Sequence, residues 1–149
     1  MEKLDKREKR LRRIWWMYII ALFLLVVIKF HGSLSAITSR IEYNSLPSSI
    51  NYNLIPFQTI GSQLENISAG WAQYNLLGNI IPFLPFGFLL PLAFKKIHSF
   101  GKVIGVGFVA ILCIEVFQYA TKTGSFDVDD IILNMTGIVL GYLLMKLLA

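Results

Sequence analysis

Cysteine and charge are scarce in this chain, and each scarcity excludes a class of protein. Cys113 is the single cysteine among 149 residues, which excludes an internal disulfide and a cluster of thiolate metal ligands. Charged residues make up 15% of the chain, against about 25% in an ordinary soluble domain. The sequence also lacks a G-x-S-x-G elbow, a Walker loop and an H-E-x-x-H helix. Because 55% of the residues are apolar, a disordered chain is excluded and an integral membrane protein is indicated.

Most of the excess positive charge lies at the start of the chain. Residues 1–13 carry seven basic and three acidic side chains, whereas the formal charge of the whole chain is only +5. A basic tail directly before an apolar segment is typical of a topology signal rather than of a nucleic-acid-binding surface. We therefore interpret residues 1–13 as a cytoplasmic tail and residues 14–149 as a single transmembrane domain, with no nucleic-acid partner.

Four apolar stretches predict an all-α integral membrane bundle of four transmembrane helices. They are residues 14–30, 76–94, 103–120 and 131–148. Each is close to the ~20 residues that cross a bilayer, and a backbone in lipid must form its hydrogen bonds within a helix. The first stretch also fits a cleavable signal peptide, because a basic region precedes it, but its length favours an uncleaved span.

The basic residues of the connecting segments predict the orientation of the bundle. Residues 95–102 contain three lysines, whereas residues 31–74 contain only Arg40 and residues 120–130 only Lys122. Positive residues are enriched on the cytoplasmic side of a membrane. We expect both termini in the cytoplasm and a long outer loop, residues 31–74, between the first and second spans.

Polar residues gather near the outer ends of the last three predicted spans. They are Asn79, Glu115, Gln118, Asp127, Asp129, Asp130 and Asn134. An ionisable side chain within a span costs about 2.5–3.5 kcal/mol on insertion scales, so it normally faces the bundle interior or a cavity. Spacings of three and four residues place Glu115 with Gln118 on one helix face, and Asp130 with Asn134 on another. The sequence therefore predicts a polar cluster at the level of the outer leaflet.

Structural roles explain several of the same residues. Glu115 fits a buried, hydrogen-bonded residue as well as a reactive one, and Asn134 fits a hydrogen bond between helices. Asp127 or Asp130 fits the cap of the last helix, since aspartate is favoured at helix N-termini. Gly137 and Gly141 are spaced for close helix packing.

Several short motifs in this order resemble the VanZ family. They are Asn53-Leu-Ile-Pro-Phe57, Asn75-Leu-Leu-Gly-Asn79, Pro85-Phe-Gly87, Glu115-Val-Phe-Gln118, Asp127-Val-Asp-Asp130 and Asn134-x-x-Gly137. The resemblance implies a small, multi-pass protein of the bacterial cytoplasmic membrane, in a family whose name-giving member is associated with teicoplanin resistance. Many members have an arginine shortly before the aspartates, where this chain reads Gly124-Ser125-Phe126.

Three classes of function fit these features. The first, which the resemblance favours, is an envelope protein that reduces the access or binding of glycopeptide and lipoglycopeptide antibiotics at the outer face. The second is a membrane-embedded enzyme that acts on a lipid or lipid-linked cell-wall precursor with Glu115 as general acid or base, because an ionisable residue in a span suits proton transfer. The third is a small transporter or a scaffold.

Charge and small residues suggest further partners beside the lipid bilayer. With Glu115 included, the predicted outer side carries six acidic residues against two basic ones, a balance that attracts cations. A divalent cation at Asp127, Asp129 and Asp130 is therefore a hypothesis, since carboxylates are suitable ligands for such ions. The pair Gly101 and Gly105 is spaced for contact in a homo-oligomer.

Overall fold

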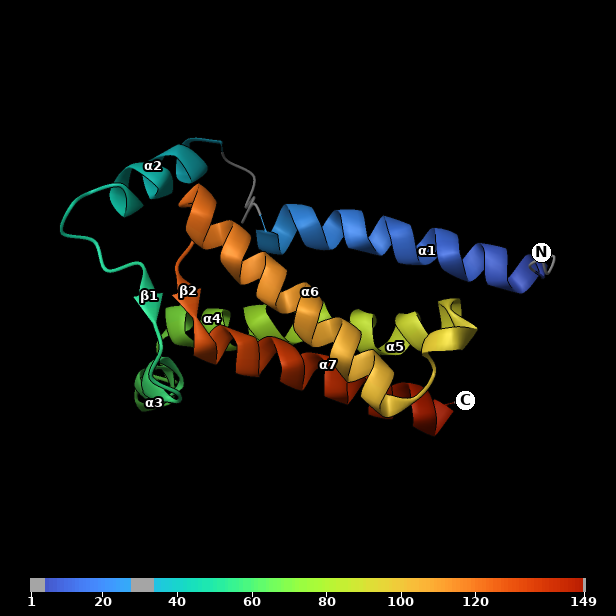
Figure 1. Cartoon of the computed structure of the whole chain (residues 1–149). Coiled ribbons are helices and arrows are strands. Elements are labelled where there is room, and N and C mark those ends of the chain that lie inside the picture. Colours follow the sequence, from blue (N-terminus) through green and yellow to red (C-terminus); the bar gives the residue numbers. More distant parts are fainter. Residues whose placement is uncertain (1–4, 28–33, 149) are drawn as a thin grey trace.

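The computed structural model describes residues 5–27 and 34–148, and almost all of its regular elements are helices (Figure 1). In chain order they are α1 (Lys6–Leu22), the π-helical turn η1 (Phe23–Val27), α2 (Leu34–Asn44), β1 (Tyr52–Asn53), α3 (Gln58–Glu65), α4 (Gly70–Ile80), the 3-10 turn η2 (Ile81–Phe83), α5 (Leu84–Ala93), the 3-10 turn η3 (Lys95–Ile97), α6 (Phe100–Thr121), β2 (Phe126–Asp127) and α7 (Val128–Leu148).

Three of the described helical segments are long and apolar enough to cross a membrane. They are Gly70–Ala93, which combines α4, η2 and α5, and the helices α6 and α7, with 24, 22 and 21 residues. The all-α membrane class expected from the sequence therefore holds. Helix α1 begins within the basic tail and has 17 residues, and residues 28–30 of the predicted first span lie outside the described part of the chain.

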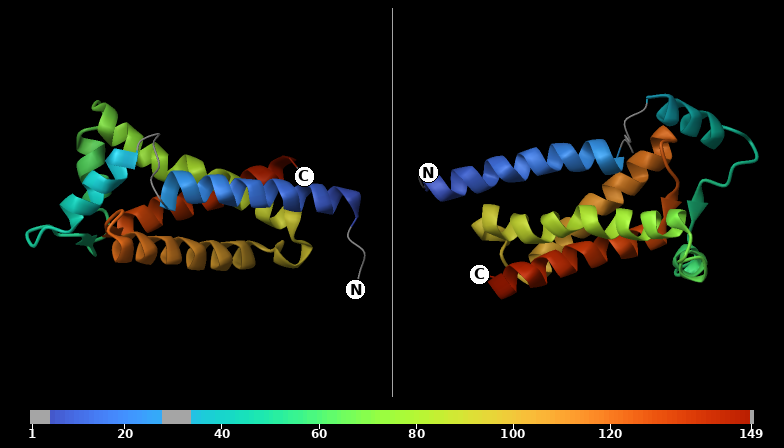
Figure 2. Two further views of the ribbon diagram at one scale, coloured as in Figure 1. Left: turned by 90° about the horizontal axis from the view of Figure 1, so that it is seen from above. Right: turned by 180° about the vertical axis from the view of Figure 1, so that it is seen from behind.

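The long helices run beside one another between two distinct ends of the molecule (Figures 1 and 2). The start of α1 and the end of α7 lie at one end, which we call the terminal end. Helices α2 and α3 and both strands lie at the other, which we call the loop end. The segment predicted as an outer loop, residues 31–74, therefore contains α2, β1, α3 and the first residues of α4, and the chain returns to the terminal end at η3.

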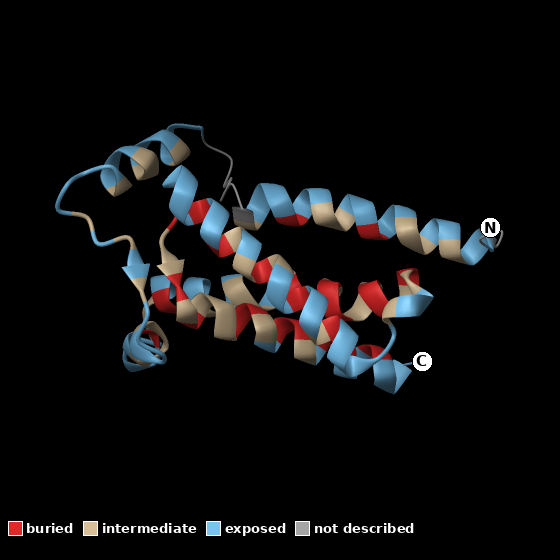
Figure 3. Ribbon diagram, in the orientation of Figure 1, coloured by how far each residue is buried: buried red, intermediate tan, exposed pale blue. Residues whose placement is uncertain are grey.

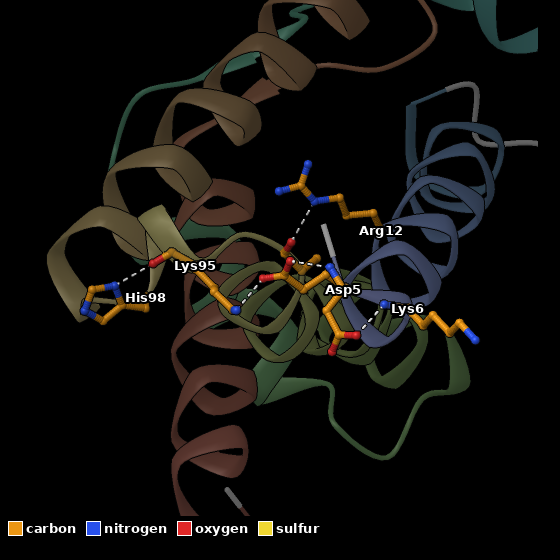
Figure 4. A network of polar contacts seen from close by, with 7 residues as sticks. Asp5, Lys6, Arg12, Lys95 and His98 are labelled. Atoms are coloured by element: carbon orange, nitrogen blue, oxygen red, sulfur yellow. Dashed lines mark hydrogen bonds and ion pairs between the residues drawn. The ribbon is translucent and has the colours of Figure 1, made fainter. Parts of the chain in front are cut away.

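At the terminal end, α1 is fixed to the segment that follows α5 (Figure 4). Asp5 and Glu8 form a capping box at the start of α1, and Glu8 also pairs with Lys95 at 2.7 Å. The hydrogen bond from Lys95 lowers the pKa of the Glu8 carboxyl. The Nε of Arg12 donates to the Ala93 carbonyl at 3.2 Å. These contacts hold the charged start of α1 beside η3.

Glycine allows α7 to lie directly against α4 and α5. A Cβ added at Gly137 would lie 2.2 Å from the Ile80 carbonyl oxygen, and one at Gly141 would lie 2.0 Å from that of Leu84. On the facing helix, a Cβ at Gly87 would lie 1.9 Å from the Ile138 carbonyl oxygen. Any side chain at these positions would force the two backbones apart. The buried residues accordingly concentrate along α5 and α7 (Figure 3).

At the loop end, a short parallel strand pair joins two distant parts of the chain. Tyr52 and Asn53 of β1 are in register with Phe126 and Asp127 of β2. The Asn44 side chain donates to the Lys122 carbonyl at 2.8 Å, which adds a tie between α2 and the end of α6. The segment of residues 34–69 is thus attached to the junction between α6 and α7.

Candidate functional site: a polar cavity at the loop end

Asp127 ends β2 and caps the helix that follows. Its Oδ1 accepts from the backbone N–H of Asp129 at 2.8 Å, the geometry of an N-cap aspartate. The same Oδ1 accepts from Asn53 Nδ2 at 3.0 Å, and Oδ2 accepts from the Thr59 hydroxyl at 2.8 Å. The side chain is almost fully buried. Asp127 therefore connects β1 and α3 to the start of α7.

Asp129 supplies the missing cap of another helix. Helix α3 begins after Phe57, whose side chain cannot accept a hydrogen bond, and whose φ of 66° is left-handed. The carboxylate of Asp129 accepts instead from the backbone N–H groups of Phe57, Thr59 and Ile60 at 2.6, 2.8 and 3.0 Å. The residue is fully buried, and a negative charge at a helix N-terminus is favourable. Its carboxylate thus anchors α3.

Asp130 and Asn79 meet between α7 and α4. Asn79 Nδ2 donates to Asp130 Oδ1 at 2.7 Å, and both residues line the same cavity. The sequence had placed these two side chains at one level from their positions in different spans. The structure brings them into direct contact.

The other residues of the predicted cluster lie deeper between the helices. Glu115 Oε2 accepts from the backbone N–H of Asp127 at 3.2 Å, and Gln118 Nε2 donates to the Val26 carbonyl at 2.6 Å. Asn134 is 1% exposed, and neither polar atom of its side chain has a hydrogen-bond partner among the described residues. Glu115, Gln118 and Asn134 are buried and lie outside the lining of the cavity.

The cavity has a volume of about 500 Å³ and a mixed lining. Leu25, Val26 and Pro82 form apolar parts of its wall. Its polar lining includes Arg40, Thr59, Gln63, Asn79, Asp127 and Asp130. These side chains come from α2, α3, α4, β2 and α7, so the cavity exists only where the segment of residues 34–69 meets the long helices. Its volume is within the range of about 300–1,000 Å³ typical of small-molecule sites.

Arg40, Thr59 and Gln63 are polar residues of this lining that sequence reasoning missed. All three belong to the segment that was expected to be a loop. Two signals pointed to them: Arg40 is the only basic residue in 31–74, and Thr59 and Gln63 are four residues apart, on one face of α3.

The carboxylates of Asp127, Asp129 and Asp130 each accept hydrogen bonds from protein donors. Within residues 5–27 and 34–148, no group of three or more His, Cys, Asp or Glu side chains is arranged to hold a metal ion. Both oxygens of the Asp129 carboxylate accept from backbone N–H groups at the start of α3. The three aspartates therefore have different roles in the fold: Asp127 caps α7, Asp129 caps α3, and Asp130 accepts from Asn79.

Comparison with known proteins identifies relatives of the chain. A sequence model of the VanZ/LLP1 family matches residues 15–149. Protein VanZ of Enterococcus faecium is 32% identical over 130 residues, which cover 84% of this chain and 66% of that relative. The chain thus spans just under two thirds of the length of the relative it matches. No solved structure matches the chain.

Proposed function

The chain belongs to the VanZ/LLP1 family, and from that premise we propose that it acts at the outer leaflet of the bacterial cytoplasmic membrane. There it reduces the access or binding of glycopeptide and lipoglycopeptide antibiotics at the cell envelope. The observation that carries the proposal is the polar cavity at the loop end, because it is a formed, ligand-sized space whose lining includes the motif residues Asn79, Asp127 and Asp130.

The distribution of charged and exposed apolar side chains supports this location. In the proposed topology α1 completes a fourth span, both termini are cytoplasmic and the loop end faces outward. The terminal end carries Lys95, Lys96 and the charged start of α1, as positive residues favour the cytoplasmic side. Exposed apolar side chains at the loop end, among them Leu54, Ile55 and Phe57, are suited to the interface between lipid and water.

An enzymatic role for Glu115 has no comparable support. Glu115 is 2% exposed, accepts the Asp127 backbone N–H and is not part of the cavity lining. A general acid or base must come within hydrogen-bond reach of its substrate, directly or through one water molecule. The geometry therefore favours binding in the cavity over proton transfer at Glu115.

Antibiotic susceptibility tests the proposal directly. Deletion should lower the minimum inhibitory concentration of teicoplanin more than that of vancomycin, because teicoplanin carries a lipid tail. The intact gene should restore resistance, whereas Asn79→Ala, which removes a cavity residue bonded to Asp130, should not. Gln73→Ala is the matched control, because Gln73 is an exposed amide of the same helix outside the cavity lining.

Two readouts complete this experiment. The amount of each variant in the membrane fraction separates loss of function from loss of protein, and fluorescent teicoplanin measures antibiotic bound per cell. Cells that lack the protein should bind more labelled teicoplanin than cells that have it. Equal susceptibility with and without the protein would refute the proposed function.

A further inference from the structure

Arg40 brings a positive group to the cavity wall, and one of its nitrogens, Nη1, is buried without a hydrogen-bond partner among the described residues. A guanidinium is always charged and offers five N–H donors in a planar fork that matches carboxylates and phosphates. Leaving such a donor buried and unpaired destabilises the protein. The arrangement therefore calls for an anionic oxygen in the cavity.

Gln63 lines the same cavity and requires a hydrogen-bond donor from the ligand. The residue is 3% exposed, lines the cavity, and its Oε1 has no donor among the described residues. An amide oxygen accepts hydrogen bonds only, so its partner must be an O–H or N–H group. The cavity thus contains an unsatisfied donor at Arg40 and an unsatisfied acceptor at Gln63.

The acidic residues of the lining restrict the ligand further. Asp127 and Asp130 outnumber Arg40, so a small anion alone would be repelled. Protein donors already reach Asp127 Oδ2 and Asp130 Oδ1, from Thr59 and Asn79 respectively. A ligand that combines one anionic group with several hydroxyl donors satisfies both sets of side chains. The apolar wall at Leu25, Val26 and Pro82 suits a ligand whose other end is apolar.

We propose that the cavity binds the headgroup of an anionic lipid whose phosphodiester carries free hydroxyl groups. Arg40 binds the phosphodiester oxygens, and Gln63 Oε1 accepts from a headgroup hydroxyl. A phosphoglycerol headgroup is the simplest group with this chemistry, and lipid-linked precursors with a phosphate beside a hydroxylated sugar share it. The inference rests on the proposed function because it names the ligand of the same cavity.

Native mass spectrometry of the full chain, titrated in detergent with phosphatidylglycerol, tests the proposal. The wild type should bind phosphatidylglycerol more tightly than phosphatidic acid, which lacks the headgroup hydroxyls, and than phosphatidylcholine, which keeps the phosphodiester but has no hydroxyl group and no net negative charge. Arg40→Gln should weaken binding by about 10- to 100-fold, the range for hydrogen bonds to a charged group. Arg40→Lys should lose less, because it keeps the charge but not the fork.

Lys122→Gln is the matched control for charge. Lys122 is an exposed cation at the loop end outside the cavity lining, so its loss should leave binding unchanged. Equal binding by the wild type and Arg40→Gln would overturn the proposal, as would equal affinity for phosphatidylglycerol and phosphatidylcholine. Displacement of the lipid by inorganic phosphate alone would overturn the assignment to a lipid headgroup.

Gln63→Leu gives a second signature, which does not depend on Arg40. Replacement of a buried, unpaired amide by an apolar group of similar size should raise the melting temperature of the lipid-free protein. The same variant should weaken phosphatidylglycerol binding. A variant with a raised melting temperature and unchanged lipid binding would refute a ligand role for Gln63.

The two proposals fail in different ways. If the wild type binds phosphatidylglycerol with the expected preference but its deletion leaves teicoplanin susceptibility unchanged, the cavity binds lipid and the proposed function is wrong. If resistance depends on the intact protein while lipid binding shows no preference for phosphatidylglycerol, the proposed function stands and the lipid assignment is wrong.

Discussion

The carboxylate of Asp129 should be one of the most important single groups for the stability of the loop end. It accepts three backbone hydrogen bonds from the first turn of α3 and is fully buried. A hydrogen bond to a charged group contributes about 1.5–3 kcal/mol. Because the three bonds share one carboxylate and water can replace part of them, we expect Asp129→Ala to cost about 3–4 kcal/mol.

Thermal unfolding of the purified protein and hydrogen exchange of its amides would measure this effect. A loss of this size lowers the melting temperature of a chain of this length by roughly 10 °C. The amides of Phe57, Thr59 and Ile60 should exchange faster in Asp129→Ala, since they lose their acceptor. Asp129→Asn should be intermediate, because its amide keeps one of the two oxygens as an acceptor.

Glu65→Ala is the matched control for Asp129→Ala. Glu65 is an exposed acid in the last turn of the same helix, where a negative charge is unfavourable. Its removal should leave the melting temperature unchanged or slightly raised. Unchanged exchange at residues 57–60 in Asp129→Ala would refute the idea that this carboxylate caps α3.

Two further predictions concern helix packing and orientation. Gly141→Ala should destabilise the protein by about 1–3 kcal/mol, because the added Cβ would meet the Leu84 carbonyl oxygen. Gly101→Ala is its control, since a Cβ there meets no other atom, and its melting temperature should equal that of the wild type. For orientation, Cys113→Ser removes the native thiol, and single cysteines are then introduced at the loop end (Glu65→Cys) or the terminal end (Lys96→Cys). A membrane-impermeant maleimide applied to intact cells should label the first variant and not the second. The reverse pattern would exclude the proposed orientation.

Long apolar runs made most of the bundle predictable. The stretches 76–94, 103–120 and 131–148 coincide, to within one residue at their ends, with the later parts of the segments that the structure shows as α4–α5, α6 and α7. The predicted spans began too late in the chain, because a polar first turn such as that of α7 is not part of the apolar run. The spacing of Gly137 and Gly141 likewise predicted the face along which α7 packs closely against another helix, because two glycines four residues apart lie on one face and allow close contact.

The loop end was much less predictable, because its stability comes from contacts between distant residues. Helix α3 has Phe57 at its cap position, and the residue that performs the capping lies 72 positions later. A hydrogen bond between residues so far apart in the sequence leaves no local sequence pattern from which it could be predicted. The convergence of Asn79 and Asp130 followed from topology and spacing, whereas the place of Arg40 in the cavity depends on how α2 is attached to the end of α6.

The parallel pairing of β1 with β2 also sets the order in which the molecule is completed during synthesis. Its two halves are 74 residues apart, and the whole of α3, α4, α5 and α6 is made between them. The earlier segment therefore remains without its partner strand, and without the acceptor that caps α3, until the start of the last helix has been made. Contacts of such sequence separation form late because a long loop must close first. The cavity at the loop end is accordingly the last part of the protein to mature, and formation of α7 is the event that completes it.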